Sequence, residues 1–130
     1  MKLIKEGKQL KLYLDEENNW LYADWYGKVN DKWVIEGLEL IYEAISEEGV
    51  GVLLNDNTNL NGTWTGVIEY VINDWYPKAL NAGYRKVAFV YSQDIFTRFS
   101  VDVLRKQDTD SPVDQKTFYS IEEAKVWLKQ

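Results

Sequence analysis

Carboxylate side chains follow two apolar stretches of the sequence, and their type and position could support chemistry. Asp56 comes after the apolar run Val50–Leu54, and Asp94 comes soon after a second run, Lys86–Tyr91. Two carboxylates at one edge of a sheet can hold Mg²⁺ or act as a general acid and base. The lysine that a receiver-type phosphoaspartate site would need has no match in the pattern, so we predict neither a metal site nor catalytic residues.

Hydroxyl side chains in the stretch after Asp56 offer a second kind of chemistry. A phosphate on Thr63 would meet the free N–H groups and the positive dipole end of a helix that is expected to start there. The alternative is that Thr63 caps this helix, because threonine is a preferred N-cap residue. Thr58 is the other residue of this stretch that we consider as a phosphate acceptor.

The composition excludes several kinds of site. The 130 residues include no cysteine and no histidine, which removes thiolate catalysis, metals bound by Cys or His, and the Ser-His-Asp arrangement. The formal charge is 15 − 21 = −6, without a cluster of Lys or Arg, so we expect no nucleic-acid partner. We predict no cofactor.

The N-terminal residues MKLIKEGK carry charges where a signal peptide would be apolar. No apolar stretch approaches the roughly 20 residues that are needed to span a bilayer. We therefore expect a soluble, cytoplasmic protein without a transmembrane segment. The length fits a single domain over residues 1–130.

The elements that position these residues follow from the hydrophobic pattern. Residues 8–14 and 20–26 alternate apolar and polar side chains, which predicts a β-hairpin. Residues 50–56 and 86–91 are apolar on both faces, which predicts strands buried in a parallel sheet. Helices are expected over 33–46, 64–80, 95–104 and 121–128, and a short edge strand over 116–119. The order β-β-α-β-α-β-α-β-α predicts an α/β fold, with about four helices packed on a mixed sheet.

Two of the predicted helices carry features that bear on function. Pro77 lies inside the second one, where it cannot donate to the Asn73 carbonyl, so we expect a kink or a short break near Tyr76. The third helix is expected to turn its apolar residues toward the core. These residues are Ile95, Phe96, Phe99, Val103 and Leu104.

The polar stretch between residues 55 and 65 is the expected binding site. Its side chains favour turns and caps over regular structure, and open α/β sheets usually bind ligands at the carboxyl ends of their strands. We expect it to lie beside the segment 92–96 at that edge. The predicted ligand- or partner-binding residues are Asn55, Asp56, Asn57, Asn59, Asn61, Gly62, Thr63, Trp64, Ser92, Asp94 and Phe96.

Aromatic residues make up 15% of the chain, more than core filling alone requires. Trp20, Tyr22 and Tyr26 share one face of the predicted hairpin. Such side chains favour interfaces and apolar pockets. Either the first helix covers this stripe and makes it part of the core, or the stripe is a homodimer surface or one wall of a pocket.

The order of elements and five short motifs resemble the STAS fold, and within it the SpoIIAA-like (STAS/SEC14-like) bacterial domains. The motifs are VLLND at 52–56, NGTW at 61–64, WYPKALNAG at 75–83, VAFVYS at 87–92 and SIEEAKVWL at 120–128. The resemblance implies a cytoplasmic, non-enzymatic regulator or ligand binder. In the anti-sigma antagonists of this group a Ser or Thr at the start of the helix after the central strand is phosphorylated. Thr63 is closest to that position, although the usual Asp-Ser-Ser-Gly arrangement is absent.

Three functions are therefore predicted. The first is a regulatory domain that binds a protein partner or a small ligand through residues 55–65 and 92–96, without catalysis. The alternative is a SEC14-like carrier of an apolar or lipid ligand, with a pocket between the second helix, the third helix and the sheet, near Phe96 and Trp75. The third is a switch in which phosphorylation of Thr63 or Thr58 alters partner binding.

Overall fold

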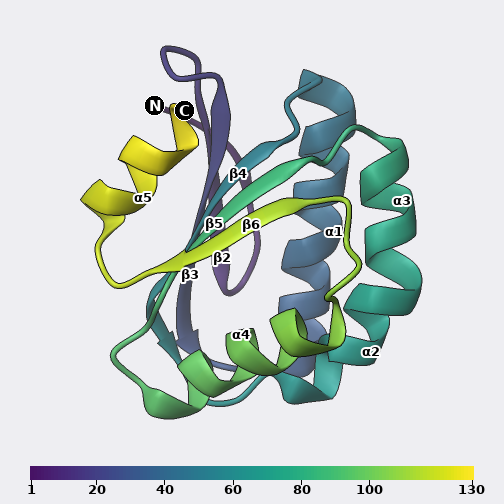
Figure 1. The fold of residues 1–130 in the computed structure, drawn as a ribbon, viewed down its shortest axis with the longest axis vertical. Helices are drawn as coiled ribbons and strands as arrows, with labels where there is room; N and C mark the ends of the chain where they lie inside the picture. The colour runs from purple at the N-terminus through teal and green to yellow at the C-terminus, as the bar shows by residue number, and fades with distance from the viewer.

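Six strands form one mixed sheet in the computed structural model, which describes residues 1–130, and the strands are hydrogen-bonded in chain order (Figure 1). They are β1 (Lys2–Glu6), β2 (Leu10–Asp15), β3 (Trp20–Lys28), β4 (Val52–Asn61), β5 (Lys86–Val90) and β6 (Asp114–Phe118). β1, β2 and β3 are antiparallel neighbours, whereas β3 to β6 run parallel. The predicted α/β class and mixed sheet are confirmed.

β1 is a strand that the sequence pattern did not predict, so the order of elements begins β-β-β rather than β-β. It pairs with β2 at the edge of the sheet, and its residues are exposed or only partly buried. Lys2, Lys5 and Glu6 place charges in this short strand, a composition that keeps sheet edges from pairing with other chains. The apolar pattern of the segment is weak because little of it enters the core.

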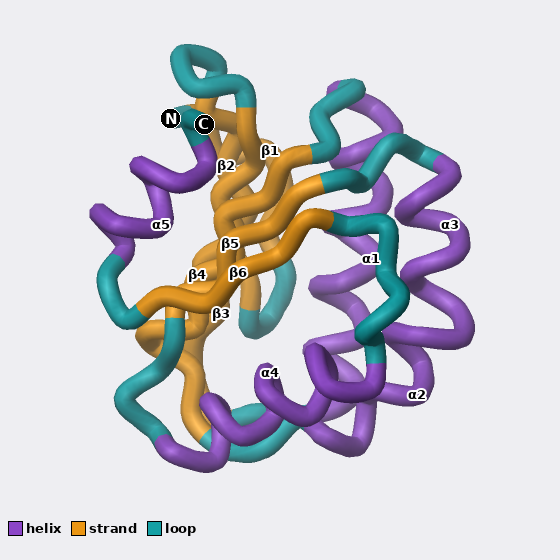
Figure 2. The backbone as a smooth tube through the Cα atoms, viewed as in Figure 1, coloured by secondary structure: helices purple, strands orange, loops and turns teal.

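Helices cover both faces of the sheet, but unequally. They are α1 (Asp31–Glu48), a continuous helix made of η1 (Thr65–Val67), α2 (Ile68–Tyr70), η2 (Val71–Trp75) and α3 (Tyr76–Asn81), then α4 (Ile95–Gln107) and α5 (Ile121–Leu128). Figure 2 shows α5 alone on one side of the sheet and the other helices on the opposite side. The larger group packs on a core of 25 buried residues, whereas α5 packs on a core of eight.

The helix over residues 65–81 accommodates Pro77 without a break. Its η2 segment is a π-turn, in which the Tyr76 N–H donates to the Val71 carbonyl, five residues earlier. Pro77 follows directly, in the first turn of α3. Because proline lacks an N–H and its ring crowds the carbonyl four residues back, a widened turn relieves the conflict that we expected to produce a kink near Tyr76.

β4 extends five residues further than predicted, so most of the expected loop over 55–65 is strand. Its last residues pair with β3 up to Lys28 and Asn61. The register shifts where Asn57 and Thr58 oppose Trp25, which is the two-against-one arrangement of a β-bulge. Pairing with a neighbouring strand, which composition does not reveal, overrides the turn preference of this polar stretch.

α4 is rotated relative to the prediction. Its buried residues are Thr97, Ser100, Val101 and Leu104, so only Leu104 of the expected inward residues is fully buried. The prediction is wrong for three others, because Ile95, Phe96 and Phe99 are 64%, 63% and 58% exposed. The hydroxyls of Thr97 and Ser100 face inward because they bond backbone groups of the neighbouring segment, which would otherwise be buried without partners.

Candidate functional site

β4 divides the predicted site between the two faces of the sheet. Side chains of a strand alternate between faces, so Asn55 and Asn57 lie on the side of α1, whereas Asp56 lies on the side of α5. Beyond the end of the strand, residues 62–64 contact α4. The eleven predicted binding residues therefore occupy three separate places.

Asp56 is 5% exposed and is surrounded by hydrogen-bond donors. The Tyr22 hydroxyl donates to its Oδ2 at 2.7 Å, and Thr58 donates to Oδ1 through its N–H at 3.0 Å and its hydroxyl at 2.5 Å. Burial and this carboxylate together raise the pKa of Tyr22 above its usual range. Tyr22 and Thr58 thus both donate to the Asp56 carboxylate. The Asx-type contact between Asp56 and Thr58 holds the bulge in β4.

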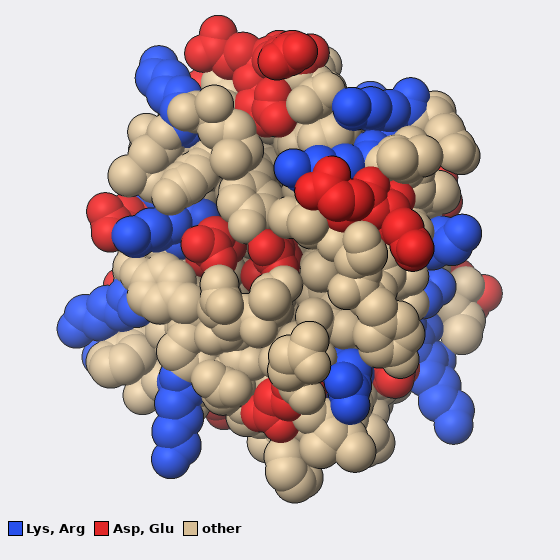
Figure 3. Space-filling model, turned by 90° about the vertical axis from the view of Figure 1, so that its left-hand side faces the viewer, with Lys and Arg blue, Asp and Glu red and all other residues tan.

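Asp24 is the register partner of Asp56 on β3, so two carboxylates lie side by side on this face. Burial, and then the charge of Asp56, raise the pKa of Asp24. Its Oδ1 atom is buried and accepts no hydrogen bond. Nowhere in the chain do three or more Asp or Glu side chains converge in a way that could hold a metal ion. Figure 3 shows this side of the molecule, where acidic and basic side chains are interspersed.

A cavity of about 60 Å³ lies on the opposite face, between the sheet, α1, the helix 65–81 and α4. Fourteen of its sixteen lining residues are hydrophobic, and the polar ones are Asn55 and Asn57. Asn55 Oδ1 accepts a hydrogen bond from Trp25 Nε1 at 2.7 Å. Trp75, in the π-turn, forms the helix side of the cavity and donates from Nε1 to the Leu38 carbonyl at 2.6 Å.

The cavity only partly matches the pocket that we predicted for an apolar ligand. It does lie between the second helix and the sheet and is lined by Trp75. Phe96 and Phe99 do not line it, because both point to solvent. An acyl chain requires a volume on the order of 300 Å³, which is about five times the volume present.

The third place joins the end of β4 to α4, and it brings the last part of the predicted segment 55–65 beside the predicted segment 92–96. Ser92 Oγ donates to the Leu60 carbonyl at 2.7 Å, and the Gly62 N–H donates to Asp94 Oδ2 at 2.5 Å. Asp94 Oδ1 accepts from the Phe96 N–H and so caps α4. These N–H donors hold the pKa of Asp94 below its usual range.

Residues of α4 complete this junction. Thr97 Oγ1 donates to the Gly62 carbonyl at 2.7 Å, and Ser100 Oγ accepts from the Trp64 N–H at 2.9 Å. Asp56 and Asp94 have separate partners, on β3 and β4 for the first, and at Gly62 and the start of α4 for the second. The two carboxylates that the sequence suggested as a pair therefore serve different parts of the fold.

The two threonines considered as phosphate acceptors are both exposed. Thr63 lies one residue before Trp64, which occupies the N-cap position of η1. Its Oγ1 accepts from the Thr65 N–H at 3.3 Å and lies 3.1 Å from Ser100 Oγ. A phosphate on Thr63 would displace the contact with Ser100, and one on Thr58 would place its charge against Asp56.

Three apolar side chains on the outer side of α4, Ile95, Phe96 and Phe99, form what we call the α4 surface. They are more than half exposed. Sequence reasoning selected Phe96 for binding but missed Ile95 and Phe99, because their spacing matched an inward-facing stripe. The signal that could have found them is the pair of hydroxyl residues, Thr97 and Ser100, on the other side of the helix.

The predicted aromatic stripe on the hairpin is divided in the structure. Trp20 is 2% exposed and lies in the core under α5, not under the first helix. The Tyr22 hydroxyl is bonded to Asp56, and the Tyr26 hydroxyl donates to the Gly7 carbonyl at 3.4 Å. Trp20 therefore offers no surface for a homodimer contact.

Comparison of the chain with protein-family models, with curated proteins and with solved structures gave no match. The resemblance to SpoIIAA-like domains stays a prediction. None of the helices has the length and apolar character that crossing a membrane requires.

Proposed function

We propose that this chain is a non-enzymatic interaction module that binds a protein partner through the α4 surface and the adjoining residues Asn61–Thr63. The role agrees with the regulatory function that the resemblance to SpoIIAA-like domains implies. The observation that carries the proposal is the exposure of Ile95, Phe96 and Phe99 on one helix end. Contiguous exposed apolar side chains on a small protein commonly mark interaction sites.

The rigidity of this helix end supports a role in recognition. Asp94 ties the first turn of α4 to Gly62, and Thr97 and Ser100 add further bonds to the segment Gly62–Trp64. A preorganised surface loses little conformational freedom on binding, which favours affinity. Asn61 and Thr63 are exposed polar residues on either side of Gly62, which is bonded to the N-cap of α4, and interfaces commonly combine an apolar centre with a polar rim.

The carboxylates argue for binding rather than catalysis. Asp56 is nearly buried and accepts three hydrogen bonds, and Asp94 accepts backbone N–H groups at a helix start. A general acid or base must reach a proton on a substrate. An enzymatic turnover that disappeared in Asp56→Ala, with the fold intact, would contradict this part of the proposal.

The charge of the chain favours a protein over an anionic membrane as the partner. The formal charge is −6, and near the apolar residues the N-cap Asp94 and Asp102 stand against a single cation, Arg98. Docking on anionic lipids relies on clustered Lys and Arg. An apolar patch without such a cluster is better matched by an apolar surface of another protein.

Site-specific photo-crosslinking in the source cells tests the proposal. A benzoylphenylalanine at Phe96 should give a discrete protein adduct, identifiable by mass spectrometry. The matched control places the same amino acid at Val126, which is also 63% exposed but lies on α5. The second substitution Phe99→Ser should reduce the adduct from position 96 at least fivefold, because it removes apolar contact area.

Two results would overturn the proposal. One is an equal set of adducts from positions 96 and 126, which would indicate nonspecific contact. The other is crosslinking of position 96 to lipid alone, which would assign the α4 surface to a membrane. Thermal unfolding of each variant checks that the fold is kept.

The alternative function is a carrier of an apolar ligand. The observation that favours it is the cavity beside Trp75 and Asn57. Its volume of about 60 Å³ accommodates a ligand of only a few atoms unless the helix 65–81 moves outward. Native mass spectrometry of protein purified from cells tests this function. A bound lipid would favour the carrier, and a clean mass of the chain alone would argue against it.

A further inference from the structure

One polar side chain in the cavity between the sheet and the larger group of helices has no partner in the chain. Asn57 is 2% exposed and lines this cavity of about 60 Å³. Asn55, the other polar lining residue, accepts from Trp25 Nε1, whereas the side-chain amide of Asn57 takes part in no hydrogen bond within the chain. The polar atoms that packing seals without a partner belong to other residues. The Asn57 amide is therefore open to the cavity, with a donor and an acceptor side by side.

The bulge in β4 fixes the direction of this side chain. Asn57 and Thr58 together oppose Trp25, and Asp56 accepts hydrogen bonds from the N–H and the hydroxyl of Thr58. Because of the additional residue, Asn57 and Leu60 both line the cavity, although regular alternation would place positions three apart on opposite faces. Bulges commonly re-aim side chains beside functional sites, so the orientation of Asn57 belongs to the backbone of the strand.

An amide at this position is unfavourable for the free chain. Buried amides are almost always hydrogen-bonded, because an unpaired one costs free energy. Leucine has a similar shape and would match the other lining residues, of which fourteen are hydrophobic. A water molecule occupies roughly 10–15 Å³ of such a volume, so one water at the amide would leave most of the hydrophobic space unfilled. An occupant with both a polar and an apolar part matches the whole lining.

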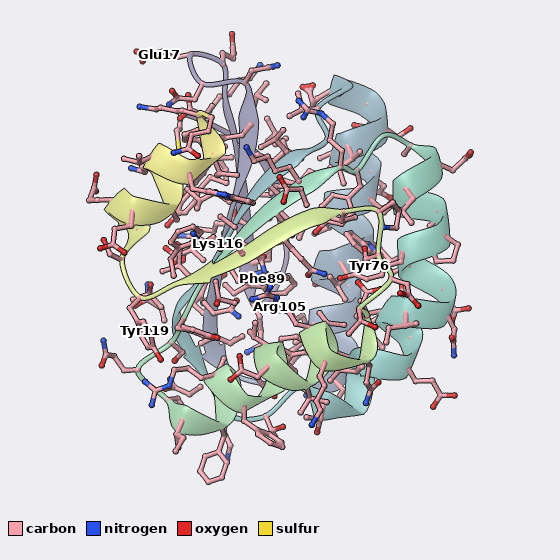
Figure 4. All side chains as sticks on the ribbon, viewed as in Figure 1. Glu17, Tyr76, Phe89, Arg105, Lys116 and Tyr119 are labelled. Carbon is pink, nitrogen blue, oxygen red and sulfur yellow. The ribbon has the colours of Figure 1, made fainter.

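The remaining walls of the cavity suit a small, uncharged apolar group. No Lys, Arg, Asp or Glu lines it, so a charged ligand would lose its hydration without gaining a counter-ion. Figure 4 shows Phe89 on the sheet side and Tyr76 on the helix side, and both line the cavity. The aromatic lining residues are Trp25, Trp64, Trp75, Tyr76, Tyr84 and Phe89.

We infer that this cavity binds a small neutral primary amide of the size of acetamide. The ligand N–H would donate to Asn57 Oδ1 and the ligand oxygen would accept from Asn57 Nδ2, which closes a ring of two hydrogen bonds. Its methyl group would contact the aromatic walls. Ile95, Phe96 and Phe99 do not line the cavity, so the inference is independent of the proposed function.

Acetamide and acetone are matched probes, because they have the same shape and acetone lacks the N–H groups. The indole N–H signals in NMR spectra report binding: Trp25, Trp64 and Trp75 line the cavity, whereas Trp20 and Trp127 pack on the other face of the sheet. We expect saturable shifts in the first three signals only. Acetamide should bind with a dissociation constant on the order of 10 mM, at least fivefold more tightly than acetone, because a site built for hydrogen bonds rejects an analogue that leaves them unpaired.

A matched pair of variants tests the role of the amide. Asn57→Leu should remove the preference for acetamide over acetone, and it should raise the midpoint of urea unfolding of the free protein, because it removes an unpaired amide. Asn59→Leu makes the same change at an exposed position of the same strand and should change acetamide binding less than twofold. The comparison of the two probes on the wild type depends on no variant.

Three results would overturn the inference. The first is an absence of saturable shifts, or equal shifts in Trp20 and Trp127, which would leave only water or nonspecific contact. The second is equal binding of acetone and acetamide, which would show that the Asn57 amide recognises nothing. The third is an Asn57→Leu variant that unfolds at lower urea concentration and keeps the preference for acetamide, which would assign the amide a purely structural role.

Discussion

One face of the sheet is covered by α1, the helix 65–81 and α4 over 25 buried residues, whereas the other is covered by α5 alone over eight. The polar side chains on the two faces have different surroundings. On the thickly covered face Asn55 is bonded to the indole of Trp25 inside an apolar cavity. On the thinly covered face Asp24 and Asp56 lie side by side with Tyr22 and Thr58. The comparison suggests that stability resides mainly in the first layer, while the second tolerates charge.

The largest expected effect comes from a pair of equally buried tryptophans. Trp75 lies in the larger core and Trp20 in the smaller one, and each is 2% exposed. Trp75→Ala should lower the unfolding free energy by about 4 kcal/mol, because it enlarges an existing cavity and removes a hydrogen bond to Leu38. Trp20→Ala should lower it by about 3 kcal/mol, at the low end for a buried tryptophan, because α5 alone can shift to fill the space.

Urea unfolding at equilibrium measures both values. The amide hydrogen-exchange rates of α5 in Trp20→Ala show whether the loss of stability is confined to the second layer. Equal losses in the two variants would mean that the thin layer contributes as much stability as the thick one, and the comparison would fail.

The next effect concerns the two sides of α4. Thr97→Val replaces a buried hydroxyl by a methyl group of the same shape and leaves the Gly62 carbonyl without its donor. It should lower the unfolding free energy by about 2 kcal/mol. Phe99→Ser, on the exposed side, should change it by less than about 0.5 kcal/mol. The opposite order in urea unfolding would mean that α4 packs through its apolar side.

The smallest effect concerns Asp24 and its dependence on pH. The folded state raises the pKa of this carboxyl, so it binds the proton more tightly than the unfolded chain does. The resulting stability is present at low pH and is lost as pH rises through the raised pKa. Asp24→Asn should therefore be more stable than the wild type at pH 7, by about 0.5 kcal/mol because solvent screens a partly exposed group.

The advantage of Asp24→Asn should shrink as the pH falls through the raised pKa of Asp24, where the carboxyl itself becomes protonated. Urea unfolding at pH 7 and pH 4 measures the difference. Lys11→Met, which removes the cation that faces Asp24 from β2, should act in the opposite direction and serves as the control. An advantage that does not depend on pH would show that the Asp24 charge is not its source.

Much of the fold could be predicted because short-range patterns determine it. Asn30 caps α1 by accepting a hydrogen bond from Trp33 N, and Gly49 ends the helix in the left-handed conformation at φ 66°. Ser120 caps α5 through Glu123 N, as the S-x-x-E pattern indicates. Residue types at these positions have few alternative uses, so the helix ends follow from the local sequence.

The parts that could not be predicted depend on neighbours that are distant in the sequence. β4 continues to Asn61 because β3 pairs with it, although the asparagines favour turns. α4 faces inward with Thr97 and Ser100 because the segment Gly62–Trp64 needs hydrogen-bond partners. In both cases a backbone requirement overrides the preference of the side chains.

The candidate site also contains some features that the sequence predicts and others that it does not. Of the segments 55–65 and 92–96 that were predicted to lie side by side, residues 60–62 do meet residues 92–97. The pairing of Asp24 with Asp56 depends on the register of two parallel strands, which no local pattern specifies. The cavity that Asn57 faces arises from packing and is visible only in three dimensions.

The π-turn over Val71–Trp75 has a consequence for how the length of its helix can vary among related proteins. A turn closed by an i→i+5 bond holds one residue more than an α-helical turn. Proteins that share this backbone should therefore differ in length by a single residue near Asn73 more readily than elsewhere in the helix. Those that lack the additional residue should also lack proline at the position of Pro77, because a regular turn leaves its ring no room.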